Sequence, residues 1–110
     1  MEQIAVTDLL PLCAAQGPRV LLLDVREPWE VAVAALRVKG VATAFIPMGE
    51  LAQRLTELDP AQLIVCLCHH GMRSQQVVAF LSRQGYRSLY NLAGGIDAWS
   101  LAVDPAVPRY

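Results

Sequence analysis

The residues most able to do chemistry are crowded into one stretch, CLCHHGMRS at positions 66–74. It holds two thiols, Cys66 and Cys68, and three potential cations, His69, His70 and Arg73. A thiol attacks as its thiolate, and neighbouring cations favour that form. No acidic residue lies between positions 64 and 81, so nothing nearby in the sequence neutralises these cations. The stretch therefore predicts a cysteine nucleophile in a site for an anionic substrate or intermediate.

The position of Cys68 distinguishes it from the other two cysteines. It ends an apolar run, LIVCLC at 63–68, that is typical of a buried strand, and a helical pattern begins near Ser74. In open α/β sheets ligands bind beyond the carboxyl ends of strands, where loop N–H groups and a helix N-terminus attract anions. Cys66 inside the run and Cys13 on an apolar helix are interpreted as small buried hydrophobes. We therefore expect Cys68 to be the nucleophile.

Other cysteine chemistries fit the spacing less well. Cys-x-Cys is not the usual zinc spacing and no second ligand cluster follows, so we expect no metal and no other cofactor. The Cys-x-x-Cys motif of thioredoxin-like redox proteins is absent. Three cysteines, an odd number, argue against a disulfide framework and favour a reducing compartment. A cytoplasmic location is the expectation.

The elements that must position this loop follow from the hydrophobic pattern. Apolar runs at 20–25, 41–47, 63–68 and 88–92 are typical of strands. Helical patterns cover 8–16, 27–36, 48–58 and 74–85, and a last short helix follows Gly94-Gly95. The alternation predicts an α/β domain with a parallel sheet, and 55% hydrophobic residues suit a sheet buried on both faces. The 110 residues fit one domain, 1–110, with an extended tail at 102–110.

Charge and hydropathy argue against two classes of partner. The net charge is −1 and the nine Lys and Arg residues form no basic run, which disfavours nucleic-acid binding. No apolar stretch approaches the roughly 18 to 20 residues that a membrane-spanning helix needs. We therefore expect neither a nucleic-acid nor a membrane partner.

Three segments together resemble the rhodanese family of sulfurtransferases. CHHGMRS (68–74) resembles the active-site loop, LLDVREPWE (22–30) the upstream Asp-Val-Arg motif and NLAGGIDAW (91–99) the C-terminal signature. They lie in the right order and spacing across nearly the whole chain. The resemblance implies a single rhodanese-like domain, a five-stranded, mainly parallel sheet flanked by helices on both faces.

The resemblance also implies a persulfide mechanism. Cys68 would take the outer sulfur of a thiosulfate-like donor and pass it to cyanide or a protein thiol, with Arg73 as the second catalytic residue. It implies structural support from Asp24 and Arg26. The substrate-binding residues would be His69, His70, Gly71, Met72, Arg73 and Ser74.

Some questions stay open at this point. Many family members carry a Gly-His-Ile segment where this chain reads AALRVKGVATAFIP (34–47), so the role of that histidine cannot be transferred. A phosphatase or arsenate reductase would need five residues between Cys and Arg, whereas Cys68 and Arg73 have four between them. A non-catalytic rhodanese-like module remains an alternative, although such modules often lack the cysteine. A monomer and a homodimer are both open.

Overall fold

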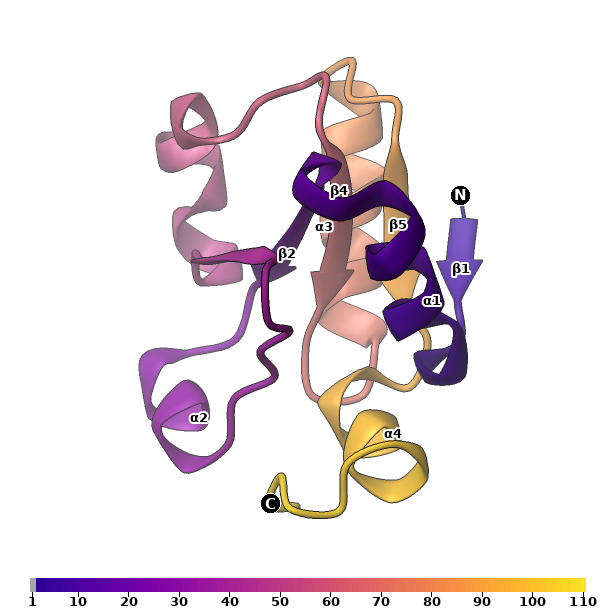
Figure 1. Ribbon diagram of the computed structural model, residues 1–110. Coiled ribbons are helices and arrows are strands. Elements are labelled where there is room, and N and C mark those ends of the chain that lie inside the picture. Colours follow the sequence, from indigo (N-terminus) through magenta and orange to yellow (C-terminus); the bar gives the residue numbers. More distant parts are fainter. Residues whose placement is uncertain (1) are drawn as a thin grey trace.

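Five parallel strands form one sheet in the computed structural model, which describes residues 2–110 (Figure 1). The strand order is β1-β5-β4-β2-β3, and every neighbouring pair is parallel. The predicted α/β class with a five-stranded parallel sheet is confirmed. The strands span Glu2–Ile4 (β1), Val20–Asp24 (β2), Ala42–Phe45 (β3), Leu63–Leu67 (β4) and Leu89–Leu92 (β5).

Several helices differ from the expected pattern, and α3 spans Met72–Arg83 where 74–85 was expected. The first begins at Val6 rather than after Thr7, and the segment at 27–36 is helical only to Val33, after which Ala34 is extended. The segment at 48–58 is a 3-10 helix with a kink at Arg54 instead of an α-helix. The bounds are Val6–Gln16 (α1), Gly17–Arg19 (η1), Pro28–Val33 (α2), Met48–Glu57 (η2), Met72–Arg83 (α3) and Gly95–Ala102 (α4). Among residues 2–110, none of these helices is long and apolar enough to cross a bilayer.

Helices cover both faces of the sheet. Side chains of β2 alternate between two cores: Leu22 joins the core under α1 and α4, and Leu23 joins the core under η2 and α3. In Figure 1, α1 lies in front of the strands and α3 behind them. All residues of β2 and β4 are buried, because both strands are central and covered on both sides. Burial on both faces explains why the sequences of β2 and β4 read as continuous apolar runs rather than alternating polar and apolar residues.

The carboxyl ends of the strands gather the site at one edge of the sheet. Because the strands are parallel, the segments that follow β2, β4 and β5 all emerge at this edge. In Figure 1 it is the lower edge, where α2, α4 and the C-terminal residues also lie. Three motifs far apart in the sequence are thereby brought to one place.

Candidate active site

The loop after β4 wraps hydrogen-bond donors around the sulfur of Cys68. The side chain is only 1% exposed, and the chain turns at Gly71, whose φ of 99° suits glycine. The Gly71 N–H donates to Sγ at 3.1 Å and the Ser74 N–H at 3.4 Å. The Ser74 Oγ lies 3.3 Å from the same sulfur. Donors aimed at one sulfur stabilise negative charge on it, which suits a nucleophile.

A residue that sequence analysis missed, Asn91, holds these donors in place. It lies on β5 and is 2% exposed. Its Oδ1 accepts a hydrogen bond from the Ser74 hydroxyl, and its Nδ2 donates to the Gly71 carbonyl at 3.1 Å. One carboxamide thus orients both residues that contact Cys68. The sequence does carry one signal for it: Asn91 is a lone amide in an apolar strand, where burying a polar group without a hydrogen-bond partner costs free energy.

The start of α4 supports the loop from the other side. The Ile96 N–H donates to the Cys68 carbonyl at 2.9 Å, and the Asp97 N–H donates to the His69 carbonyl at 3.1 Å. A Cβ atom on Gly95 would collide with both carbonyls. The glycine pair therefore forms a turn that lies directly beside the active-site loop.

Arg73 is paired with a carboxylate, so the expectation that this cation is unneutralised is wrong. Its two terminal nitrogens donate to the Glu30 carboxylate at 2.7 and 2.8 Å. These hydrogen bonds are the main cause that lowers the pKa of Glu30 from 4.5 to about 2, although burial acts in the opposite direction. Glu30 precedes Arg73 by 43 residues and lies on α2. Because Glu30 lies so far from the loop in the sequence, the residues around the loop give no sign of this pairing.

Asp24 and Arg26 form a second, fully buried pair. Arg26 donates to the Asp24 carboxylate through Nε at 2.9 Å and Nη2 at 2.7 Å. The same guanidinium donates to the Ala34 carbonyl at 2.8 Å and to the Glu30 carbonyl at 3.4 Å. These contacts fix α2 against the end of β2. They are the contacts that a supporting role for the pair requires.

The tail folds back onto the site and ends there with Tyr110. Its hydroxyl donates to the Glu30 carboxylate at 2.7 Å and accepts from Arg26 at 3.0 Å, so it links the two pairs. Its ring stacks on His69 at 3.8 Å between centroids, and His69 stacks on His70 at 3.9 Å. The apolar residues and terminal aromatic of the tail sequence are compatible with packing either on this domain or on a partner, and the structure shows Tyr110 packed on its own domain. From the stretch 34–47, which replaces the Gly-His-Ile segment, the Ala34 carbonyl accepts from Arg26 and the Ile46 N–H donates to the Asp24 carbonyl.

The two histidines differ in their surroundings. Burial, followed by the neighbouring His70, lowers the pKa of His69 below its usual 6.5, so its ring is neutral at pH 7. Its Nε2 is buried and has no hydrogen-bond partner among the described residues. The His70 side chain is 61% exposed, with Nδ1 3.9 Å from Asp97. Met72 is also exposed, at 76%.

Cys66 and Cys13 are buried in the two cores, as interpreted from the sequence. Cys66 is fully buried, and burial is the main cause that raises its pKa to about 12. Burial also raises the pKa of Cys13. Such thiols are poor nucleophiles.

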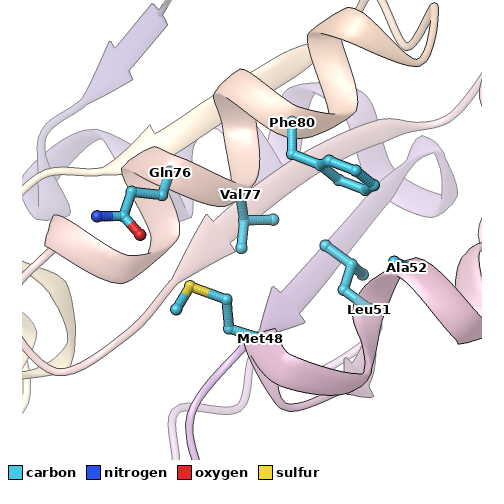
Figure 2. Close-up of a pocket in the computed structure, with 6 residues that line it drawn as sticks. All are labelled: Met48, Leu51, Ala52, Gln76, Val77 and Phe80. Carbon is cyan, nitrogen blue, oxygen red and sulfur yellow. The ribbon is translucent and has the colours of Figure 1, made fainter.

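A separate pocket of about 200 Å³ lies between η2 and α3 (Figure 2). Its walls carry no titratable or nucleophilic side chain. They are formed by Met48, Leu51, Ala52, Gln76, Val77 and Phe80. The pocket is therefore no candidate for the chemistry.

Comparison with protein families agrees with the geometry of the loop. The Rhodanese-like domain matches residues 8–102. The chain belongs to the rhodanese-like family. A rhodanese-related protein of Thermoplasma volcanium superimposes over 100% of both chains with a TM-score of 0.78 and 29% sequence identity.

Two curated relatives of this rhodanese-like chain carry sulfurtransferase names. A sulfurtransferase of Allochromatium vinosum is 37% identical over 81 residues, which cover 74% of this chain and 72% of the relative. The thiosulfate sulfurtransferase GlpE of Pseudoalteromonas translucida is 30% identical over 108 residues, which cover 98% and 97%. An Arabidopsis thaliana chloroplastic Rhodanese-like/PpiC domain-containing protein is 43% identical over 90 residues, but only 30% of its length is covered. Family and relatives together support sulfur transfer as the general activity.

Proposed function

We propose that this domain moves a sulfane sulfur from thiosulfate or a similar donor to a thiophilic acceptor through a persulfide on Cys68. The observation that carries the proposal is the ring of donors around Sγ, from the Gly71 and Ser74 N–H groups. Such a ring stabilises a thiolate before the reaction and a charged terminal sulfur after it. Cys66 and Cys13 lie instead in the two apolar cores, where burial raises the pKa of each thiol.

The reaction proceeds in two displacements. The Cys68 thiolate attacks the outer sulfur of thiosulfate, the S–S bond of the donor breaks, and sulfite leaves with the bonding electrons. Cys68 then carries the sulfur as a persulfide. An acceptor, cyanide or a protein thiol, attacks the terminal sulfur and regenerates the thiolate. Ping-pong kinetics follow from this covalent intermediate.

A thiosulfate:cyanide assay of matched cysteine variants tests the proposal. We expect Cys68→Ser to abolish the activity and Cys66→Ser to retain it, because only Cys68 lies among the loop donors. Mass spectrometry of the wild type treated with thiosulfate should find one added sulfur atom on Cys68.

Two outcomes would overturn the proposal. One is sulfur transfer that survives in Cys68→Ser. The other is hydrolysis of an aryl phosphate without any sulfur transfer, which would favour the phosphatase or arsenate-reductase alternative. If wild type shows neither activity while folded, the non-catalytic binding module is the remaining function.

A further inference from the structure

The Ser74 hydroxyl has two polar neighbours and a single proton to donate. Its oxygen lies 3.3 Å from the Cys68 Sγ, and it also contacts the Oδ1 of Asn91. A hydroxyl donates one hydrogen bond and accepts up to two, so only one of these neighbours can receive its proton. The atom that receives the proton decides whether Ser74 stabilises a negative charge on the sulfur.

The hydrogen bonds of Asn91 fix the orientation of its carboxamide. The Nδ2 donates to the Gly71 carbonyl at 3.1 Å and to the Gln3 Oε1 at 3.0 Å. A backbone carbonyl cannot donate, so the amide nitrogen must be the atom that faces Gly71. Oδ1 therefore faces the Ser74 hydroxyl. Because an amide oxygen only accepts, Ser74 is the donor of that hydrogen bond.

Cys68 consequently faces a lone pair of the Ser74 hydroxyl rather than its proton. An S–H group can donate to this lone pair, which gives a continuous series of hydrogen bonds from Cys68 through Ser74 to Asn91. When the thiol releases its proton to water, the thiolate gains from the hydroxyl only if the hydroxyl turns toward the sulfur. That turn takes the donor away from Oδ1 of Asn91, which is 2% exposed. A buried acceptor that loses its donor costs free energy, so the turn is opposed.

We propose that Asn91 is a positioning residue that withholds the Ser74 hydroxyl proton from Cys68, favours the thiol over the thiolate, and so sets the pH above which this cysteine attacks a sulfur donor. The Gly71 and Ser74 N–H groups act in the opposite direction, because they donate to Sγ. Asn91 thus limits the reactivity that these two donors promote. The inference rests on the proposed function, since it takes Cys68 as the nucleophile.

Titratable groups surround Cys68 on several elements, and the test must hold them constant. Arg73 and Cys66 interact electrostatically with Cys68, and Arg73 is paired with Glu30 of α2. Substitutions at positions 74 and 91 leave all of these groups in place, so their contribution cancels when variants are compared. The other charged or titratable groups of the loop, of the end of β2, of α4 and of the tail are His69, His70, Asp24, Arg26, Asp97, Arg109 and Tyr110.

A double-mutant cycle at Ser74 and Asn91 tests the inference. Wild type, Ser74→Ala, Asn91→Leu and the double variant are titrated by the ultraviolet absorbance of the thiolate, and each titration is corrected with the same protein carrying Cys68→Ser. In the Asn91→Leu background the hydroxyl is free to donate to the sulfur, so adding Ser74→Ala should raise the midpoint pH by about one unit. In the wild-type background Ser74→Ala removes no donor from the sulfur and should not raise the midpoint.

The cycle separates this effect from a purely structural role of Asn91. Asn91→Leu also loses the hydrogen bond to the Gly71 carbonyl, but that loss is common to both proteins of the Asn91→Leu background and cancels in their difference. Tyr90→Phe removes a hydroxyl from the adjacent position of β5 and is the matched control. It should leave the midpoint where it is in wild type.

Two results would overturn the role of Asn91. One is a rise of about one unit on Ser74→Ala in the wild-type background, because the hydroxyl would then already donate to the thiolate. The other is an equal effect of Ser74→Ala in both backgrounds. If Asn91→Leu does not fold, Ser74→Ala alone decides, since a rise contradicts the inference and the absence of a rise supports it.

The failure of the proposed function gives a different result. Addition of sulfur to Cys68 from thiosulfate is measured by mass spectrometry on the same preparation of wild type. If the cycle behaves as expected but Cys68 gains no sulfur, the proposed function fails and the role of Asn91 stands. If Cys68 gains sulfur but the cycle shows either contrary result, only the role of Asn91 fails.

Discussion

Two carboxylate–guanidinium pairs share the hydroxyl of Tyr110, yet they differ in the sequence separation of their members and in exposure to solvent. Asp24 and Arg26 are two residues apart, and both side chains are 0% exposed. Glu30 and Arg73 are 43 residues apart and join α2 to the start of α3, with the Arg73 side chain 33% exposed. The first pair braces one segment from within the core. The second ties the active-site loop to another element at the surface.

The difference in exposure decides what breaking each pair costs. A buried charge that loses its partner cannot be rehydrated, so removing one member of such a pair is expensive. A half-exposed guanidinium can turn to water instead. We therefore expect the short pair to control folding and the long pair to control the loop.

The largest effect should come from Asp24→Ala, which leaves the Arg26 charge buried. We expect a loss of about 3–5 kcal/mol in the free energy of unfolding, measured by urea denaturation. Glu57→Ala breaks an exposed ion pair with Arg54 and is the matched control, with little change expected. A loss in Asp24→Ala no larger than in the control would contradict the interpretation that the buried Asp24–Arg26 pair stabilises the folded state.

A smaller effect should follow from Glu30→Gln, which removes the charge from the long pair. We expect a loss of about 1–3 kcal/mol at neutral pH, because charge-assisted hydrogen bonds to Arg73 weaken while Arg73 stays hydrated. Thermal unfolding of both proteins in the same buffer measures it. A loss equal to that of Asp24→Ala would mean that exposure does not distinguish the pairs.

Lowering the pH should abolish the contribution of the Glu30 carboxylate to the free energy of unfolding. Its pKa is about 2 in the folded protein and 4.5 ordinarily, so the unfolded chain binds its proton first as the pH falls. The contribution is therefore fully present above about pH 4.5 and disappears as the pH approaches 2. The difference in unfolding free energy between wild type and Glu30→Gln should shrink across this window. A constant difference would be the contrary result.

The smallest effect should come from Tyr110→Phe, which removes the hydroxyl that links the pairs and keeps the ring on His69. We expect a loss of about 1 kcal/mol in the free energy of unfolding. A double-mutant cycle with Glu30→Gln should give a combined loss smaller than the sum of the two single losses. Strict additivity would show that the two side chains are not coupled.

Much of the fold was predictable because the relevant signals are local. The apolar runs of β2 and β4 predict central strands, since strands buried on both faces carry no polar alternation. The segment at 48–58 shows the limit. Its leucine spacing suggested an α-helix, but a kink at Arg54 and 3-10 turns bring Leu51 and Leu58 into the same core.

The candidate site was predictable only in its centre. Cys68 and the glycines around it follow from the order of strand, loop and helix. Asn91, Glu30 and Tyr110 act on the loop from β5, α2 and the tail, and no spacing rule connects them with it. Of these three, only Asn91 carried a visible signal, as an amide inside an apolar strand.

The sequence by itself determined the alternation of strands and helices, the place of Cys68 beyond a buried strand and the membership of the rhodanese-like family. The first two properties depend on residues that are neighbours in the chain, and family membership depends on three motifs that are each continuous in the sequence. Only the tertiary structure decided which groups surround Cys68 and how its charges are balanced. Hydrogen bonds and Coulomb interactions depend on distance in space. The fold brings Glu30 and Arg73, 43 positions apart in the sequence, close enough for a nitrogen–oxygen distance of 2.7 Å. The loop that looked cationic in the sequence is therefore balanced in the folded protein.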